Sequence, residues 1–93
     1  MKENTDIYVK AKSIKDFESL NVIKRELEKK VILIIKIKPS LNRNIKELKK
    51  IIDNLNEYVS LIGGDIGKLE KNTIIVTSPG IKIWRSNNIN KFL

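Results

Sequence analysis

One segment in the middle of the chain shows the strongest periodicity. Residues 41–61 contain no proline or glycine, and apolar residues recur there at alternating steps of three and four: Ile45, Leu48, Ile52, Leu55, Val59 and Ile62. This spacing predicts an amphipathic helix of about 30 Å. A second apolar line through Ile51 and Tyr58 widens the stripe, so we expect a further surface to pack there. Gly63 and Gly64 then end the helix, because glycine readily adopts the left-handed conformation of a helix end.

Two strands and a shorter helix are predicted before this segment. A period-two alternation predicts a first strand whose buried face carries three apolar residues: Ile7, Val9 and Ala11. Ser13 offers a cap for a helix over residues 16–30, where apolar residues recur at helical spacing. Residues 31–38 are mostly β-branched and apolar, which predicts a central strand covered on both faces.

Three closely spaced strands are predicted after the double glycine, over residues 65–69, 73–77 and 81–85. The element order is then βαβαβββ. An α/β two-layer sandwich, with two helices packed on one face of a mixed sheet of about five strands, buries the apolar faces of these elements. We expect one domain over residues 1–93, with an ordered core at about 6–85 and a loose tail at 86–93.

The composition limits the class of protein. The 93 residues include 19 Lys and Arg against 11 Asp and Glu, a net charge of +8, and no histidine or cysteine. Without thiols and imidazoles the usual transition-metal ligands are missing, so we expect no metal and no cofactor. The longest apolar run is five residues, whereas a membrane span needs about 20. Since no secretory signal precedes Asp6, we expect a cytoplasmic protein.

The sequence offers no convincing catalytic motif. Residues 63–68 look like a phosphate-binding loop, but Leu69 stands where Ser or Thr would hold Mg²⁺, and the segment leads from a helix into a strand. Four candidate acids have no second acid at a spacing suited to acid-base catalysis: Asp16, Asp53, Asp65 and Glu70. We therefore do not expect an enzyme.

The predicted sheet leaves one face without helices. Trp84 alternates with Ile81 and Ile83 in the last predicted strand, so that face would carry Tyr8, Ile75 and Trp84. A monomer rarely leaves such an apolar patch bare, so we expect a homodimer. The sequence leaves open whether this face or the wide helix stripe forms the contact.

With this element order, the chain from Tyr8 to Arg85 resembles the core domain of SepF proteins, in their archaeal form. The most specific part is residues 62–79, where the long helix ends in Ile-Gly-Gly-Asp-Ile and a later strand and turn read Ile-Ile-Val-Thr-Ser-Pro. Residues 9–11 and 14–17 agree more loosely. The resemblance implies a non-enzymatic adaptor of cell division and septum formation. Such a homodimer binds the C-terminal tail of the tubulin-like protein FtsZ and links it to the membrane at the division site.

The resemblance also implies functional residues. Gly63 and Gly64 would form a tight turn beside a peptide pocket, Lys68 would meet acidic groups of the peptide, and Ile74 and Val76 would line the apolar floor. The dimer interface would include residues near the end of the long helix and in the last strand: Tyr58, Leu61, Ile62 and Trp84. Gly63 and Gly64 are equally explained as a helix stop, and Ile74 and Val76 as core.

One departure and two alternatives remain. SepF proteins usually begin with an amphipathic membrane-targeting helix, and none is visible before Asp6, so the chain is either a truncated core or a naturally short relative. Membrane contact is expected only through such a helix. The charge of +8 also suits a small nucleic-acid-binding module similar to Alba chromatin proteins, although Arg clusters are missing and nucleic acid is not our expected partner. A self-assembling structural protein is the other alternative.

Overall fold

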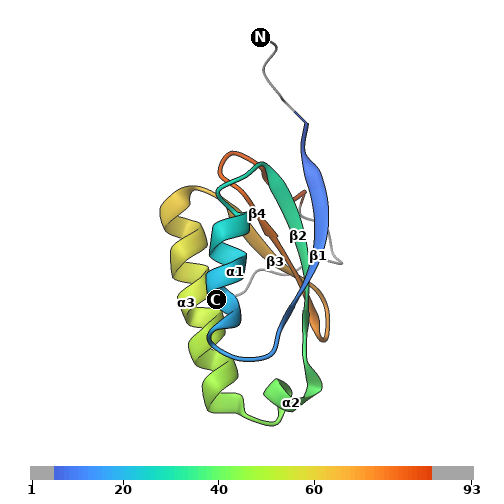
Figure 1. The fold of residues 1–93 in the computed structure, drawn as a ribbon, viewed down its shortest axis with the longest axis vertical. Helices are drawn as coiled ribbons and strands as arrows, with labels where there is room; N and C mark the ends of the chain where they lie inside the picture. The colour runs from blue at the N-terminus through green and yellow to red at the C-terminus, as the bar shows by residue number, and fades with distance from the viewer. Residues whose placement is uncertain (1–5, 85–93) are drawn as a thin grey trace.

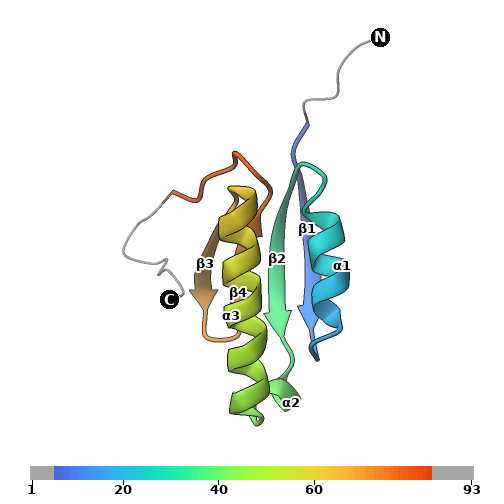
Figure 2. The same ribbon diagram turned by 90° about the vertical axis from the view of Figure 1, so that its left-hand side faces the viewer.

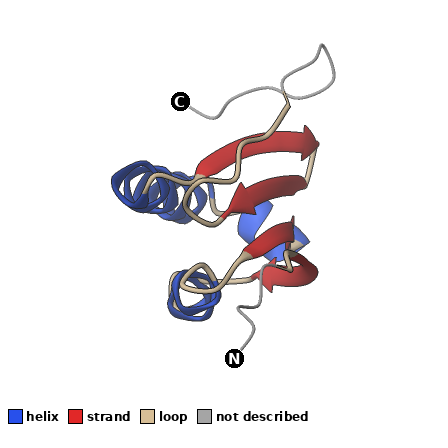
Figure 3. Ribbon diagram, turned by 90° about the horizontal axis from the view of Figure 1, so that it is seen from above, coloured by secondary structure: helices blue, strands red, loops and turns tan. Residues whose placement is uncertain are grey.

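The computed structural model describes residues 6–84. In chain order the elements are β1 (Tyr8–Ile14), α1 (Ser19–Glu26), β2 (Val31–Ile37), α2 (Pro39–Asn42), α3 (Ile45–Ile62), β3 (Asp65–Glu70) and β4 (Thr73–Thr77), as Figure 1 and Figure 2 show. The sheet order is β1-β2-β4-β3, with β1 parallel to β2 and β4 antiparallel to both its neighbours. Figure 3 shows α1 and α3 on the same side of the sheet. The predicted two-layer α/β sandwich is therefore confirmed.

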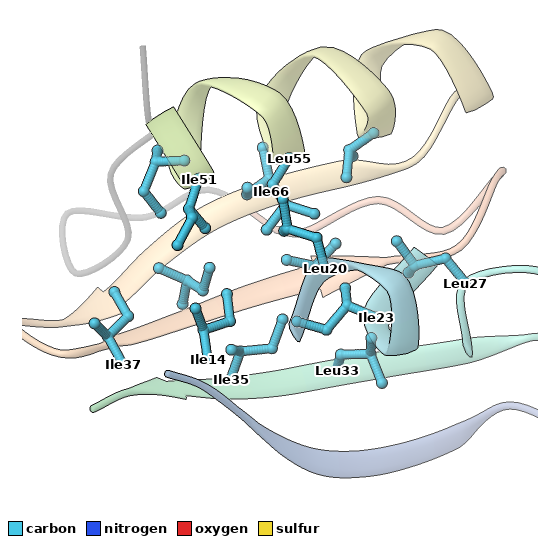
Figure 4. Packing of buried hydrophobic residues seen from close by; sticks show 14 of the residues in the cluster. Ile14, Leu20, Ile23, Leu27, Leu33, Ile35, Ile37, Ile51, Leu55 and Ile66 are labelled. Atoms are coloured by element: carbon cyan, nitrogen blue, oxygen red, sulfur yellow. The ribbon is translucent and has the colours of Figure 1, made fainter. Parts of the chain in front are cut away.

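The core lies between the sheet and these two helices. Every second residue of β2 is buried there, because alternate side chains of a strand share a face. Ile74 and Val76 of β4 lie in register with Ile35 and Leu33 of β2 and are equally buried. The helices add a matching buried layer: Leu20, Ile23, Ile51, Leu55 and Val59. Figure 4 labels the first four of these. Burying each such side chain stabilises the fold by about 1.5–3 kcal/mol.

The long helix begins later than the sequence pattern suggests. The prediction of a continuous helix from residue 41 is wrong, because the one-turn helix α2 ends at Asn42 and α3 starts at Ile45. Asn44 has a non-helical backbone, and its side chain accepts a hydrogen bond from the Glu47 N–H at 3.3 Å. This cap gives α3 a definite start.

The first helix is also shorter than predicted. It covers Ser19–Glu26 rather than residues 16–30. Ser13, predicted as its cap, is part of β1. The residue before the helix, Glu18, makes no side-chain cap, but the Asp16 side chain accepts a hydrogen bond from the N–H of the first helical residue, Ser19, at 3.0 Å.

The prediction that Ile7, Val9 and Ala11 form the buried face of the first strand is wrong, because the opposite face of β1 lies toward the helices. By register Tyr8, Lys10 and Ile14 share the face of the buried β2 residues, whereas Val9 is 62% exposed on the other face. Lys10 and Lys12 both lie on the helix side and form ion pairs with the Glu26 carboxylate of α1. The distances from their Nζ atoms to its oxygens are 2.8 Å and 3.8 Å. An ion pair thus makes a polar face compatible with the helix layer, which the alternation alone could not reveal.

The fifth strand predicted at 81–85 is absent over residues 81–84, and Arg85 lies outside the described residues. The chain turns directly after β4, with Gly80 at φ 83° and the Ile81 N–H donating to the Ser78 carbonyl at 3.2 Å. The Ile81 carbonyl then accepts from the Thr77 hydroxyl at 2.6 Å, and the Ile83 N–H donates to the Asp65 carboxylate at 2.9 Å. Side chains therefore bind backbone groups that a strand ladder would use. The predicted loose tail at 86–93 also lies outside the described residues.

Candidate partner-binding site

The predicted peptide site lies at the end of the sheet where α3 leads into β3. Gly63 caps α3 in the left-handed conformation (φ 80°, ψ 20°). The Gly63 N–H donates to the Ser60 carbonyl at 3.3 Å, and the Gly64 N–H donates to the Val59 carbonyl at 3.0 Å. The double glycine is thus a helix stop, as the sequence analysis allowed.

Gly64 is required for a different reason from Gly63. Its φ is not positive, but a Cβ added there would lie 2.2 Å from the Thr77 carbonyl oxygen and 3.3 Å from Val59 Cγ1. A Cβ on Gly63 would meet nothing within 4 Å. The start of β3 and the end of β4 therefore approach each other as closely as only glycine permits.

A small polar network joins this turn to the segment after β4. The Asp65 N–H donates to the Thr77 hydroxyl at 2.8 Å, and the Asp65 carboxylate accepts from the N–H groups of Ile66 and Ile83, both at 2.9 Å. The Gly80 N–H donates to the Gly63 carbonyl at 3.1 Å. This structural role of Asp65 was not predicted from the sequence, although its position directly after the two glycines could have indicated it.

Ser78 extends the network to the turn between α1 and β2. Its side chain is buried, accepts from the Val31 N–H at 3.1 Å and donates to the Lys29 carbonyl. The Ser78 N–H donates to the Val31 carbonyl at 3.1 Å. The sequence predicts only a turn near Ser78, because the hydrogen-bond partners of its hydroxyl are 47 and 49 residues away in the chain.

The three predicted peptide contacts in the strands lie in different surroundings. Lys68 is exposed on the edge strand β3, and by register it faces the helix layer together with Ile74. Ile74 and Val76 are completely buried in the core. In the single chain, only Lys68 of the three presents its side chain to an incoming partner.

The four predicted dimer contacts also separate into two groups. Leu61 and Trp84 are 79% and 87% exposed, which is unusual for such large apolar side chains. Ile62 packs partly against the core. Tyr58 is half-buried, and Lys24 Nζ of α1 lies 5.1 Å from its ring centre, a cation–π contact. Of the four, Leu61 and Trp84 therefore present more side-chain surface for a contact than Tyr58 and Ile62 do.

The helix-free face of the sheet carries an apolar patch. In the strand register Val9 of β1 pairs with Ile32 of β2, and Ala11 of β1 pairs with Ile34 of β2, which in turn pairs with Ile75 of β4. We call these five residues the sheet patch. None of the five is fully buried, and no described residues form a second layer of helices over them. Ile75 was predicted on this face, while Tyr8 was not correctly placed, because it lies on the helix side.

Glu26 of α1 lies in a distinct electrostatic environment. The pKa of its carboxyl is lowered, mainly because Lys10 Nζ donates a hydrogen bond to it, with the charges of Lys29 and Lys12 acting in the same direction and desolvation opposing them. Within residues 6–84, acidic side chains form no group of three or more that could hold a metal ion. No helix in the same range is long and apolar enough to cross a membrane.

A mixed sheet covered by helices on one face, with a glycine turn and exposed apolar side chains, defines a small two-layer α/β domain. Comparison with known proteins gives its family. Residues 9–83 match the family described as cell division protein SepF, and the chain belongs to that family.

Two solved structures agree with this assignment. The SepF-like protein from Pyrococcus furiosus has 31% identity and a TM-score of 0.77, with 88% of this chain and 99% of that chain covered. The SepF-like protein from Archaeoglobus fulgidus has the same fold at 24% identity and a TM-score of 0.79, with 86% and 95% covered. No curated protein sequence matches the chain.

Proposed function

We propose that this SepF-family protein is a non-enzymatic, homodimeric adaptor that binds the C-terminal tail of FtsZ and links it to the division machinery at the membrane. The family match over residues 9–83 carries the proposal, because it places the chain among cell division proteins. The exposed apolar side chains support a binding role.

For the peptide site we propose the surroundings of the α3–β3 turn. Gly63 and Gly64 shape the turn, and Lys68 offers an exposed positive charge on the edge strand. Ile74 and Val76 would act from beneath, as the buried support of this surface. An apolar surface bordered by lysine suits a short peptide that combines apolar and acidic residues.

The peptide proposal is tested by titrating the protein into a labelled FtsZ C-terminal peptide from the same organism, with fluorescence anisotropy as the readout. We expect saturation at one peptide per chain, and about tenfold weaker binding for Lys68→Glu, equivalent to about 1.4 kcal/mol. Lys46→Glu makes the same charge change at an exposed lysine of α3 and serves as the control. Equal weakening by both variants would remove Lys68 from the site, and no binding by the folded protein would refute the adaptor role. Gly64→Lys is a poorer test, because any side chain there disturbs the fold.

For the dimer we propose the sheet patch as the main contact, with Leu61 and Trp84 as the alternative surface. The patch is continuous across β1, β2 and β4, whereas Tyr58 and Ile62 already pack within the chain. Light scattering of Ile34→Asp should give a monomer and Leu61→Asp a dimer. The reverse result would assign the contact to the end of α3.

Membrane contact in this proposal requires an amphipathic helix in addition to the described core. The apolar faces of α1 and α3 are buried against the sheet and cannot also enter a lipid surface. The core itself would act on the cytoplasmic side, at the division site.

A further inference from the structure

A basic hollow lies at the opposite end of the sheet from the glycine turn. In Figure 2 the arrowheads of β1, β2 and β3 point to this end, where α2 also lies. The hollow has a volume of about 490 Å³, and the end of β2 and the β3–β4 turn contribute three lysines to its lining: Lys36, Lys38 and Lys71. We call this site the basic hollow.

The strand register explains why polar groups gather there. Lys36 is in register with Ser13 of β1 and with Thr73 of β4, and Thr73 is in register with Glu70 of β3. One polar row therefore crosses all four strands directly below the apolar rows of the sheet patch. All four residues line the hollow.

The three lysines are exposed and carry uncompensated charge. Within residues 6–84, ion pairs occupy Lys10, Lys12, Lys29 and Lys49, and none involves a lysine of the hollow. Glu70 is the single acid that the described residues contribute to the lining, so their three lysines and one glutamate leave a charge of +2. Such a concentration of unpaired positive charge attracts an anion.

The backbone around the hollow is held in place before any ligand binds. The Ile37 N–H donates to the Asn72 carbonyl at 2.8 Å, and the Lys38 N–H donates to the Ile14 carbonyl at 2.9 Å. The Asn42 side chain donates to the Asn72 side chain at 2.8 Å and ties α2 to the β3–β4 turn. Binding would thus order only the lysine side chains, which limits its entropic cost.

We propose that the basic hollow binds a phosphate group that carries about two negative charges, either on a soluble molecule or on a lipid headgroup. The group's charge matches the +2 of the hollow, and its several oxygens can accept from ammonium groups and from the hydroxyls of Ser13 and Thr73. A carboxylate brings one charge and two oxygens and fits less well. Among residues 6–84, no aromatic or arginine side chain lines the hollow, so this part of the chain does not give it the stacking surfaces typical of nucleic-acid sites. The proposal does not depend on the adaptor role.

The test uses inorganic pyrophosphate as the soluble probe and vesicles as the lipid probe. Calorimetric titration measures the first, and co-sedimentation compares phosphatidylcholine vesicles with and without phosphatidic acid. The variant Lys36→Gln, Lys38→Gln, Lys71→Gln removes the hollow's charge. The control Lys15→Gln, Lys46→Gln, Lys82→Gln removes three other exposed lysines, so both variants have the same net charge.

We expect one probe per chain for the unaltered protein, binding weakened at least about tenfold in the hollow variant, and a change of less than about threefold in the control. Circular dichroism checks that both variants are folded. Pyrophosphate binding alone indicates a soluble ligand, and selective binding of phosphatidic acid vesicles indicates a lipid headgroup. If both variants lose affinity equally, the binding depends only on the net charge of the protein, and the proposed site is wrong. Absence of saturable binding to both probes, or displacement by a polyglutamate peptide that binds more tightly, would also overturn it.

Discussion

Substituting Gly64 by alanine tests whether the close approach of β3 and β4 fixes the candidate site. The added Cβ would lie 2.2 Å from the Thr77 carbonyl oxygen, so the two backbones must separate by about 1 Å to reach an ordinary contact of 3.4 Å. That shift also strains the hydrogen bond from the Asp65 N–H to the Thr77 hydroxyl, now 2.8 Å. The substitution thus perturbs sterics and hydrogen bonding at one point.

The expected cost follows from these two effects. Overpacking in a well-packed region costs about 1–3 kcal/mol, and loss of one hydrogen bond adds about 1 kcal/mol. The free energy of unfolding should therefore fall by about 2–4 kcal/mol. For a domain of this size that lowers Tm by about 10–30 °C. Gly63→Ala is the matched control, because its cost of about 1–2 kcal/mol arises only from the left-handed backbone.

Thermal and urea unfolding followed by circular dichroism measure these differences, and amide hydrogen exchange adds a local readout. The Asp65 N–H should lose protection in Gly64→Ala and keep it in Gly63→Ala. Equal stability of the two variants, or unchanged protection of the Asp65 amide in Gly64→Ala, would refute the argument from close approach.

Two further predictions concern stability away from the site. The first concerns pH, because the pKa of Glu26 is lowered in the folded protein. Its ion pairs stabilise the protein fully above the unfolded pKa of about 4.3, and this stabilisation is lost as the pH falls through the lower folded pKa. Glu26→Gln should therefore lose less stability than the unaltered protein between about pH 5 and pH 3 in urea unfolding, and an equal loss in both proteins would contradict this. The second concerns the helix cap: Asn44→Ala should lower the free energy of unfolding by about 1 kcal/mol, and Asn44→Asp should leave it almost unchanged, because only the alanine removes the acceptor for the Glu47 N–H. Equal urea-unfolding midpoints of the two variants would show that the cap is unimportant.

Much of the fold could be predicted because the relevant signals are local. The periodicity of α3, the apolar alternation of β2 and the glycine stop each depend on residues close together in the chain. The family resemblance rested on one such stretch, residues 62–79, and the family assignment is confirmed.

The candidate site was predicted less completely, because its contacts join distant parts of the chain. The partners of Asp65 and Ser78 are up to 49 residues away, and no sequence spacing indicates them. The same limitation explains why residues 81–84 form no strand, since the Asp65 carboxylate binds the Ile83 N–H and the Thr77 hydroxyl binds the Ile81 carbonyl.

By itself, the sequence determined the four strands, the two longer helices, the glycine turn and the family, because these follow from side-chain periodicity and backbone preference within short segments. Only the tertiary structure decided which face of β1 meets the helices. Alternation places Val9 and Lys10 on opposite faces but does not say which is inside. Ile14 is fully buried on the helix side of β1, and Lys10 and Lys12 on the same side form ion pairs with Glu26. Val9 and Ala11 therefore lie beside Ile32, Ile34 and Ile75 on the open face of the sheet.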